Sequence, residues 1–503
     1  DYLMGIDVGT SACKVSVFDG DGALLSAASS GYALMTPRPG WVEQDPDDWW
    51  RAVCAACKEA LDGLDAGRIA GVGIDGQSWA AVALDGDGQP LCPTPIWMDT
   101  RAEGLCRELD ARLGERLFAV SGNPLSPSYT LPKVLYWQRH APDMLARTGK
   151  VLQCNGYIAY RLTGTLSHDV SQGYGWQVFD QRRLTWDREL CREVGLPERL
   201  LPELAACHEV VGRVTEAAAR LTGLAPGTPV VAGGLDAACG TLGAGVLHAG
   251  QTQEQGGQAG GMSICIDQYA ADPRLILSAH VVPGRWLLQG GTTGGGGTLN
   301  WFARELAGYA AAEAAERDCS VFEVLSEEAE AVPPGSDGLF FLPYMSGERS
   351  PLWDPNARGV FFGLGYDKSR GHLVRAMMEG TAFALQHNLE VAAAAGAEVD
   401  AMVTVGGAGN SRVWTQIKCD VTGKAIEVAR SDTATTLGAA MLAGVGVGLY
   451  PDFDAAVQRC VRLTRRQEPN PDTAAAYRRS YDLYRKLYPA LHPLMDEVAG
   501  WKE

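Results

Sequence analysis

The sequence predicts an α/β fold built from two domains. Three observations lead to this prediction: the length of the chain, its repeated units of strand, glycine turn and helix, and a pattern that restarts near the middle. A chain of 503 residues is too long for one hydrophobic core. Units of strand, glycine turn and helix are typical of α/β architecture. We predict domains at 1–248 and 249–503.

The first thirty residues predict a three-stranded meander. The apolar strand "YLMGIDV" is followed by the turn "GTSA", the strand "CKVSVFD", a tight "GDG" turn and "ALLSAASS". A second D-G-D-G occurs within residues 80–91. A calcium loop would need a downstream glutamate, which is missing, so both copies are predicted to be hairpin turns.

A helix is predicted to start at Asp45, which can cap it, with Pro46 in its first turn. The same helix contains Cys54 and Cys57 in a lone C-x-x-C. No second cysteine pair or histidine pair has ligand spacing. We therefore interpret these thiols as helix packing, not as a metal or redox site.

The second half repeats the organisation of the first. Its glycine-rich "GGQAGGMSICID" again leads into an alternating strand. Strand, glycine loop and helix follow in "WLLQGGTTGGGGTLNWFARELAG" and in "AMVTVGGAGNSRVWTQIKCDVTG", with helical stretches at 310–331 and 370–397 between them. Because each half begins with a hairpin on a glycine turn, we predict a duplicated domain with a cleft between the copies.

Composition excludes some classes of function. The net charge of −17 argues against a nucleic-acid surface, which needs a basic stripe. The uncharged "TATTLGAAMLAGVGVGLYP" is a better buried helix than a membrane span, so no membrane partner is expected. The sequence opens on a strand, and we expect no cleavable leader. Scattered single cysteines indicate reduced thiols and a cytoplasmic protein.

The first chemical motif is "GIDVGTSACK". Asp7 ends a buried strand, and Gly9, Thr10 and Ser11 form a turn that could cradle phosphates, with Lys14 on the outgoing strand. The carboxylate could hold a hydrated Mg²⁺. The alternative is that Asp7 only forms the turn. Three further glycine loops, at 254–261, 290–297 and 405–411, favour nucleotide binding, and none is a P-loop.

Asp236 is the one charge in "VVAGGLDAACGTLGAG". A carboxylate among small and apolar residues either caps a helix or is a catalytic group, and the two roles are compatible. We expect the positive end of the helix dipole to lower its pKa and keep it ionised as a base.

Four segments resemble the FGGY family of carbohydrate kinases. They are "GWVEQDPDDWW", "PIWMDTR" (95–101), "SYTLPKVLYWQRH" (128–140) and "GERSPLWDPNARGVFFGLGYDKSRGHLVRAMMEG" (347–380), the last matching the family's second signature without gaps. The order of hairpin turn, aspartate-bearing turn, second hairpin turn and two glycine loops is also that of the actin-like sugar kinases. The resemblance covers essentially the whole chain.

This resemblance implies two actin-like (ribonuclease H-like) domains with ATP, Mg²⁺ and a sugar in the cleft between them. Asp236 falls on the catalytic aspartate, which accepts a proton from a sugar hydroxyl. Metal is expected at Asp7 and Asp236. ATP contacts are expected at Gly9, Thr10, Ser11, Lys14, Gln258, Gly296, Gly407, Ala408 and Ser411. Sugar contacts are expected at Gln77, Ser78, Trp79, Trp97, Asp99 and Asp236.

Departures from the family pattern leave alternatives open. Gln258 stands where the family has threonine, which allows weak ATP binding, another donor or lost activity. Ser78 and Trp79 replace the usual residues of xylulose kinases and also argue against a glycerol kinase. Trp79 could stack on a sugar or pack in the core. Asp99 could line the pocket or form an ion pair with Arg101.

The sequence therefore predicts an ATP-dependent kinase for a small sugar, with D-xylulose as the leading substrate. Another polyol or sugar acid (ribulose or gluconate) and a catalytically weak sugar- or nucleotide-binding relative are the alternatives. Expected partners are small molecules, and a homodimer is compatible with the resemblance. Glu348 and Arg349 are expected to fix the second domain near the cleft.

Overall fold

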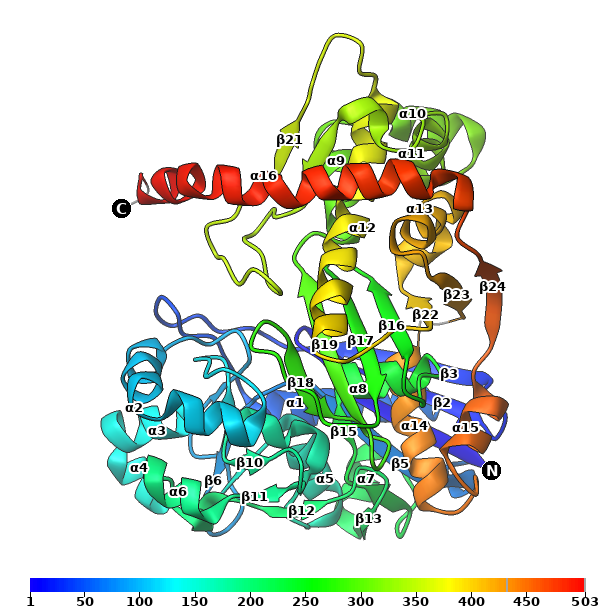
Figure 1. The fold of residues 1–503 in the computed structure, drawn as a ribbon. Coiled ribbons are helices and arrows are strands. Elements are labelled where there is room, and N and C mark those ends of the chain that lie inside the picture. The colour runs from blue at the N-terminus through cyan, green and yellow to red at the C-terminus, as the bar shows by residue number, and fades with distance from the viewer. Residues whose placement is uncertain (431–432, 502–503) are drawn as a thin grey trace.

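The computed structural model describes residues 1–430 and 433–501. Two seven-stranded sheets form its framework, with helices packed around them (Figure 1). The predicted α/β class is confirmed. The predicted boundary after residue 248 falls in the loop between helix α8 and strand β16.

The first sheet has the order β13-β14-β5-β1-β2-β3, with β15 paired to β5. β1 and β2 are antiparallel, and β1 and β5 are parallel. The predicted N-terminal meander is thus confirmed. Its strands are β1 (Tyr2–Val8), β2 (Ala12–Asp19), β3 (Leu24–Gly31), β5 (Ile69–Gly76), β13 (Val210–Arg213), β14 (Pro229–Val231) and β15 (Gly234–Leu235).

The second sheet has the order β18-β19-β17-β16-β22-β23-β24. It repeats the core of the first: β16 and β17 form an antiparallel hairpin, and β22 runs parallel to β16. This repetition agrees with the predicted duplication. Its strands are β16 (Gln251–Gly256), β17 (Gly260–Ile266), β18 (Ile276–Ala279), β19 (Trp286–Thr292), β22 (Ala401–Val405), β23 (Ala425–Ala429) and β24 (Leu463–Gln467).

The predicted first helix is α1 (Pro46–Ala60). The Asp45 side chain caps it by accepting a hydrogen bond from Asp47 N at 2.9 Å. Cys54 and Cys57 are unpaired, and Cys57 is fully buried in the core beside the first sheet. The helix-packing interpretation of this C-x-x-C is confirmed.

Two helices rich in small residues pack on the first sheet: α8 (Asp236–Gly243) and α14 (Ala434–Gly446). α14 follows the second sheet in sequence yet contacts β1 and β5 of the first. A Cβ atom on Gly5 would lie 1.9 Å from Thr436 O, and one on Gly73 would lie 1.8 Å from Ala439 O. Glycine in both strands is therefore what allows the helix to approach so closely. The prediction of a buried helix here is confirmed.

The structure adds detail to two predicted elements. The stretch around 310–331 is helical, as predicted, and consists of two helices, α10 (Gly308–Arg317) and α11 (Val321–Glu330). Asp318 takes a left-handed conformation that ends α10, and a capping box at Ser320 starts α11. The strand before Asp236 is split into β14 and β15, where Gly233 has φ 76°.

Both D-G-D-G segments are turns, as predicted. Asp19 Oδ1 accepts backbone hydrogen bonds from Asp21 and Ala23, each at 2.9 Å. Asp85 Oδ1 does the same for Asp87 and Gln89. Each first aspartate thus organises its own turn.

The remaining helices are α2 (Glu103–Ser121), α3 (Thr130–His140), α4 (Pro142–Arg147), α5 (Cys154–Thr163), α6 (Arg188–Val194), α7 (Glu216–Thr222), α9 (Gly296–Glu305), α12 (Arg370–Ala394), α13 (Arg412–Thr422), α15 (Phe453–Cys460) and α16 (Ala474–Gly500). The short strands are β4 (Glu43–Gln44), β6 (Val82–Leu84), β7 (Thr94–Pro95), β8 (Lys150–Leu152), β9 (Ser167–Asp169), β10 (Phe179–Asp180), β11 (Thr185–Trp186), β12 (Glu203–Ala205), β20 (Phe340–Leu342) and β21 (Val360–Phe362).

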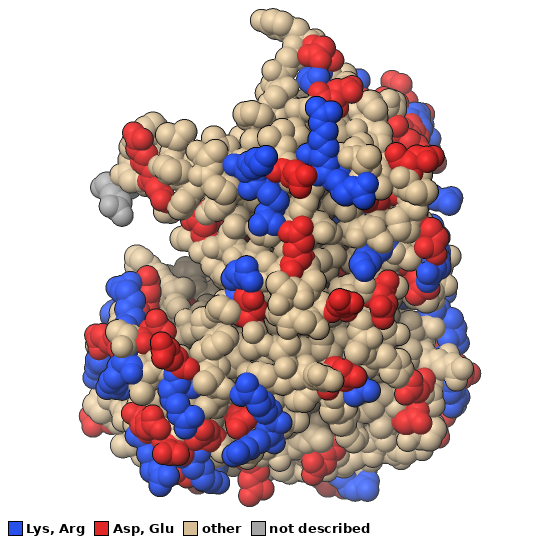
Figure 2. Space-filling view, viewed as in Figure 1, with Lys and Arg blue, Asp and Glu red and all other residues tan. Residues whose placement is uncertain are grey.

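Figure 2 shows a deep notch between the two halves of the molecule, on the side where α16 projects. Acidic and basic side chains are interspersed on this face. In the described part of the chain, no helix is long and apolar enough to span a membrane.

Candidate active site

Three carboxylates gather where strands of the first sheet end. Asp7 in β1 lies opposite Asp75 in β5, and Asp75 lies opposite Gly234 in β15, two residues before Asp236. Asp75 was not among the predicted site residues. A signal for it existed, because the tripeptide Gly-Ile-Asp occurs at both 5–7 and 73–75.

The electrostatics of Asp236 correct the sequence prediction. Burial of its carboxyl group, together with the negative charge of Asp7, raises its pKa to about 7 instead of lowering it. The N-cap of α8 is Leu235, and Asp236 is the first residue of the helix. Its Oδ1 accepts one short hydrogen bond, 2.6 Å from Ala237 N, which does not offset the desolvation.

Burial also raises the pKa of Asp7 and of Asp75, and the charges of Asp7 and Asp236 raise that of Asp75 further. Lys14 opposes the shift of both. The site thus concentrates carboxyl groups where water is scarce.

In the turn between β1 and β2, the carbonyls of Gly9, Thr10 and Ser11 accept hydrogen bonds, while two backbone amides have no acceptor among the described residues. Gly9 O accepts a hydrogen bond from the hydroxyl of Tyr32, and Ser11 O accepts one from Tyr32 N. Thr10 O accepts from Gln44 Nε2 at 2.7 Å. The amides of Thr10 and Ser11 have no acceptor among the described residues. Such a turn suits an anion.

Gln77 and Trp97, predicted on the sugar side, reach this same turn. Trp97 Nε1 donates to Thr10 Oγ1 at 2.9 Å. Gln77 Nε2 donates to Gln44 Oε1 at 2.8 Å, and its own buried Oε1 has no donor among the described residues. Gln44 and Tyr32 were missed from the sequence, because no motif distinguishes them from ordinary polar residues.

The turn between β16 and β17 has the same construction. The carbonyls of Gly257 and Gln258 accept hydrogen bonds from the amides of Gly296 and Gly297, at 2.7 and 2.9 Å. The amides of residues 257–259 have no acceptor among the described residues. The exposed Gln258 side chain lies directly over Gly297, where a Cβ atom would be 2.2 Å from its Nε2.

The glycine loops converge behind this second turn. Gly256, Gly296, Asn388, Ala408 and Lys418 are among the residues that line one cavity. It brings together two of the predicted nucleotide residues.

Gly407, Ser411 and Lys14, also predicted to contact the nucleotide, do not line this cavity. Gly407 faces open space. Ser411 is the N-cap of α13; its Oγ accepts from Trp414 N at 3.2 Å and lies 3.0 Å from Ser326 Oγ. Lys14 is exposed.

Glu348 and Arg349 lie between the end of β19 and the Trp97 ring. Glu348 is 6% exposed and accepts hydrogen bonds from Thr292 Oγ1 at 2.7 Å and Thr293 N at 2.9 Å. The Arg349 guanidinium lies 5.6 Å from the centre of the Trp97 ring, which is bonded to the first turn. These contacts support the predicted role of the pair near the cleft.

Of the two alternatives for Trp79, stacking on a sugar and packing in the core, the structure favours core packing. Its half-buried ring meets Tyr129 and Tyr174 edge-on, at centroid distances of 4.7 and 5.8 Å. Its backbone is left-handed, with φ 59°, and its carbonyl accepts a 2.7 Å hydrogen bond from Lys133 Nζ. Burial lowers the pKa of Lys133 to about 7. The neighbouring Ser78 is half-buried.

Asp99 forms the ion pair with Arg101 that was the alternative to lining the sugar pocket. It has no exposed surface, and its Oδ2 lies 2.7 Å from Arg101 Nη2 and accepts a hydrogen bond from Val42 N. Arg101 Nη2 also lies 2.6 Å from Glu43 Oε1. With its carboxylate occupied and fully covered, Asp99 holds a loop together and presents no group to a sugar.

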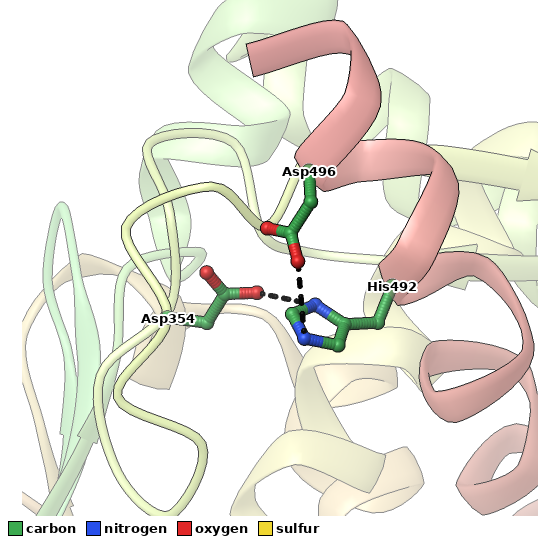
Figure 3. Close-up of side chains that lie close together, drawn as sticks. All are labelled: Asp354, His492 and Asp496. Carbon is green, nitrogen blue, oxygen red and sulfur yellow. Dashed lines mark ion pairs between the residues drawn. The ribbon is translucent and has the colours of Figure 1, made fainter. Parts of the chain in front are cut away.

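Among the described residues, one cluster has a histidine and two carboxylates close enough together to hold a metal ion. It consists of Asp354, His492 and Asp496. Figure 3 shows the imidazole between the two carboxylates, its Nδ1 3.2 Å from Asp354 and its Nε2 3.4 Å from Asp496. Because each ring nitrogen faces a different carboxylate, this is a salt-bridged link from α16 to the 347–358 segment.

Known proteins resemble this chain over nearly its whole length. Two family models match: the FGGY family of carbohydrate kinases, N-terminal domain, at residues 2–243, and its C-terminal domain, at 270–447. Xylulose kinase of Bacillus subtilis is 30% identical over 491 residues, which cover 97% of this chain and 96% of that protein. Gluconokinase of the same organism is 28% identical over 504 residues, covering 100% and 98%.

The crystal structure of xylulose kinase from Rhodospirillum rubrum superposes with a TM-score of 0.91 at 31% identity, covering 99% of this chain and 100% of that one. The predicted actin-like (ribonuclease H-like) fold is therefore confirmed. The chain belongs to the FGGY family of carbohydrate kinases, phosphotransferases that act on an alcohol group.

Proposed function

We propose that this protein transfers the γ-phosphoryl group of ATP to a hydroxyl of D-xylulose or a closely related small sugar. The observation that carries the proposal is the pair of hairpin turns, each with consecutive amides that lack acceptors, together with the acidic group that includes Asp236. Two such turns suit the phosphates of a nucleotide, and phosphoryl transfer depends mainly on positioning and on charge neutralisation.

Asp236 is the proposed base. A general base works best when its pKa lies near the operating pH, and burial places that of Asp236 at about 7. It would align the acceptor hydroxyl and take its proton as the phosphoryl group transfers in line. Exclusion of water between the closing halves would keep water from acting as acceptor.

The residues predicted to contact ATP fall into three places: the first turn, the second turn and the loops around the cavity behind it. Gly9, Thr10 and Ser11 form the first proposed phosphate turn and Gln258 belongs to the second. Gly296 and Ala408 line the cavity behind the second turn, and Gly407 and Ser411 belong to the same 405–411 loop as Ala408. Lys14, exposed beside Asp7, can approach a phosphate.

Mg²⁺ is expected with ATP, and its charge would neutralise the phosphate oxygens. The carboxylates Asp7 and Asp236 are the predicted ligands. The donor set fits, because the buried Asp7 and the half-buried Asp236 lie near a third carboxylate, Asp75, whose two oxygens have no N–H or hydroxyl donor among the described residues.

Xylulose kinases among the similar proteins support D-xylulose, and the gluconokinase match supports a sugar acid as the second candidate. Gln77, Ser78 and Trp97 remain proposed sugar contacts, and Trp79 shapes that pocket through its packing. Asp99 is withdrawn from this set because its carboxylate is covered.

Two domains at 1–248 and 249–503, a cytoplasmic location and a homodimer complete the proposal. Thirteen unpaired cysteines support a reducing compartment. Exposed apolar side chains on α16 and just beyond it, Leu494, Val498 and Trp501, support association of two copies. Light scattering after gel filtration would measure the mass.

The test is ADP formation from ATP and Mg²⁺ with a panel of ketopentoses, polyols and sugar acids. We expect turnover that depends on D-xylulose or a near relative. ADP formation that no sugar stimulates would contradict the proposal and favour the catalytically weak relative.

A further inference from the structure

Two carboxylates lie side by side where β1 and β5 end. Parallel pairing places the two Gly-Ile-Asp tripeptides in register, with Asp7 opposite Asp75. Neighbouring strands run about 4.8 Å apart, so side chains at paired positions on one face are in contact. Because side chains alternate along a strand, each aspartate shares its face with Gly5 or Gly73, the face on which α14 packs.

Asp75 is buried with nothing to stabilise its charge. It has no exposed surface, and its oxygens find no N–H or hydroxyl donor among the described residues; the group within hydrogen-bonding reach is the carboxyl of Asp7. Asp7 beside it is only 8% exposed. A buried carboxylate without hydrogen bonds or a counter-charge is strongly unfavourable, so a cation or a proton has to lie between the two groups.

The surrounding chain supplies little of that positive charge. Lys14 is paired with Asp7 across β1 and β2, and its charge favours ionisation of both carboxyl groups, but its side chain is exposed and forms no ion pair with a described carboxylate. On the other side of Asp75, the paired residue is Gly234, which has no side chain. The pair is therefore balanced either by a proton that the two carboxyl groups share or by a cation bound from solution.

We propose that Asp7 and Asp75 together hold one divalent cation of the Mg²⁺ class, and that they do so before the nucleotide binds. Mg²⁺ takes oxygen ligands and is commonly held by one or two carboxylates, with water and substrate phosphates in its other positions. The turn whose amides lack acceptors begins two residues after Asp7, so this cation borders the proposed phosphate site. The inference rests on the proposed function and adds Asp75 to its site.

The test is a titration of the full-length, nucleotide-free protein with Mn²⁺. Electron paramagnetic resonance measures how much of the ion remains free. We expect one bound Mn²⁺ per chain, displaced by Mg²⁺, and at least tenfold weaker binding in Asp75→Asn. Asn has the size of Asp and keeps the buried position filled. Asp87→Asn, which removes one charge from an exposed turn, is the control and should bind as the wild type does.

Thermal unfolding separates loss of the metal from loss of the fold. Without divalent cations, Asp75→Asn should melt at or above the wild-type temperature, because the carboxylate repulsion is gone. Saturating Mg²⁺ should raise the melting temperature of the wild type and not that of the variant.

Equal Mn²⁺ affinity in the wild type and Asp75→Asn would overturn the inference. So would a nucleotide-free wild type that binds no Mn²⁺ at millimolar concentration, the result expected if the two carboxyl groups only share a proton. Neither result depends on turnover. A wild type that binds Mn²⁺ but forms no ADP with any sugar would contradict the proposed function and leave the cation site standing.

Discussion

At the scale of single residues, Asp236 shows what a sequence can and cannot give. Its place after a glycine-rich strand, among small apolar residues, was enough to select it. Its pKa was predicted in the wrong direction, because helix position is visible in a sequence and desolvation is not. The cost of burying its carboxyl group beside Asp7 exceeds the help of the one amide at its helix start.

Asp236→Asn should lower kcat by about 10²- to 10⁴-fold, because the amide cannot accept the proton. Its KM for ATP should change little. In the wild type, kcat should fall at acidic pH, because only the deprotonated carboxylate acts as a base, and bound Mg²⁺ should shift that fall below the value of about 7 that the pKa has in the metal-free site. Steady-state kinetics from pH 4.5 to 8.5 would measure this, and a profile with no fall on the acidic side would count against Asp236 as the base.

Lys133 gives a prediction for stability. Its pKa in the folded protein is about 7, lowered by burial from its usual 10.5. Between these values the unfolded chain binds more protons, so stability should rise with pH, by up to about 1.4 kcal/mol per unit from this group.

Lys133→Met should remove this contribution. Urea unfolding at pH 7 and pH 9 would show a smaller gain in the variant than in the wild type. The same gain in both would show that Lys133 is not the group responsible.

At the scale of elements, local signals predicted well. The meander, the cap at Asp45 and the glycine loops each depend on residues within a few positions of one another. The packing of α14 across to β1 and β5 could not be predicted, because it joins segments more than 350 positions apart. The pairing of Asp7 with Asp75 was missed for the same reason, although the repeated tripeptide pointed to it.

Gly73→Ala should destabilise the protein by about 1–3 kcal/mol or prevent folding, because its Cβ would lie 1.8 Å from the backbone of α14. Gly104→Ala is the matched control, since a Cβ there meets nothing within 4 Å. It should stay within about 1 kcal/mol of the wild type. Equal effects of both changes on the free energy of unfolding would refute the close contact.

The salt-bridged link of His492 should hold the end of α16 to the 347–358 segment. His492→Gln should speed amide hydrogen exchange in both segments while costing less than about 1 kcal/mol of global stability. Asp482→Asn, an exposed change on the same helix, should leave both unchanged. Unaltered exchange in His492→Gln would show that the link is dispensable.

At the scale of the whole molecule, two sheets with the same core pairing each present a hairpin turn, and in each turn consecutive amides lack an acceptor among the described residues. The Glu348–Arg349 segment joins the end of β19 to the Trp97 ring. The family and its fold were predictable because long motifs carry them. The sugar was not, because residues such as Gln77 and Trp97 bond to Gly9 and Thr10 of the first turn, and no spacing in the sequence reveals these contacts.

The most direct measurement is ADP formation by the wild type and Asp236→Asn with ATP, Mg²⁺ and D-xylulose beside ribulose, gluconate and glycerol. We expect the wild type to turn over with D-xylulose or a near relative, and the variant to lose that activity while still binding ATP. If the wild type turned over none of these sugars, the assignment of this site as that of a sugar kinase would be contradicted. Undiminished turnover in Asp236→Asn would contradict the role of Asp236 as its base.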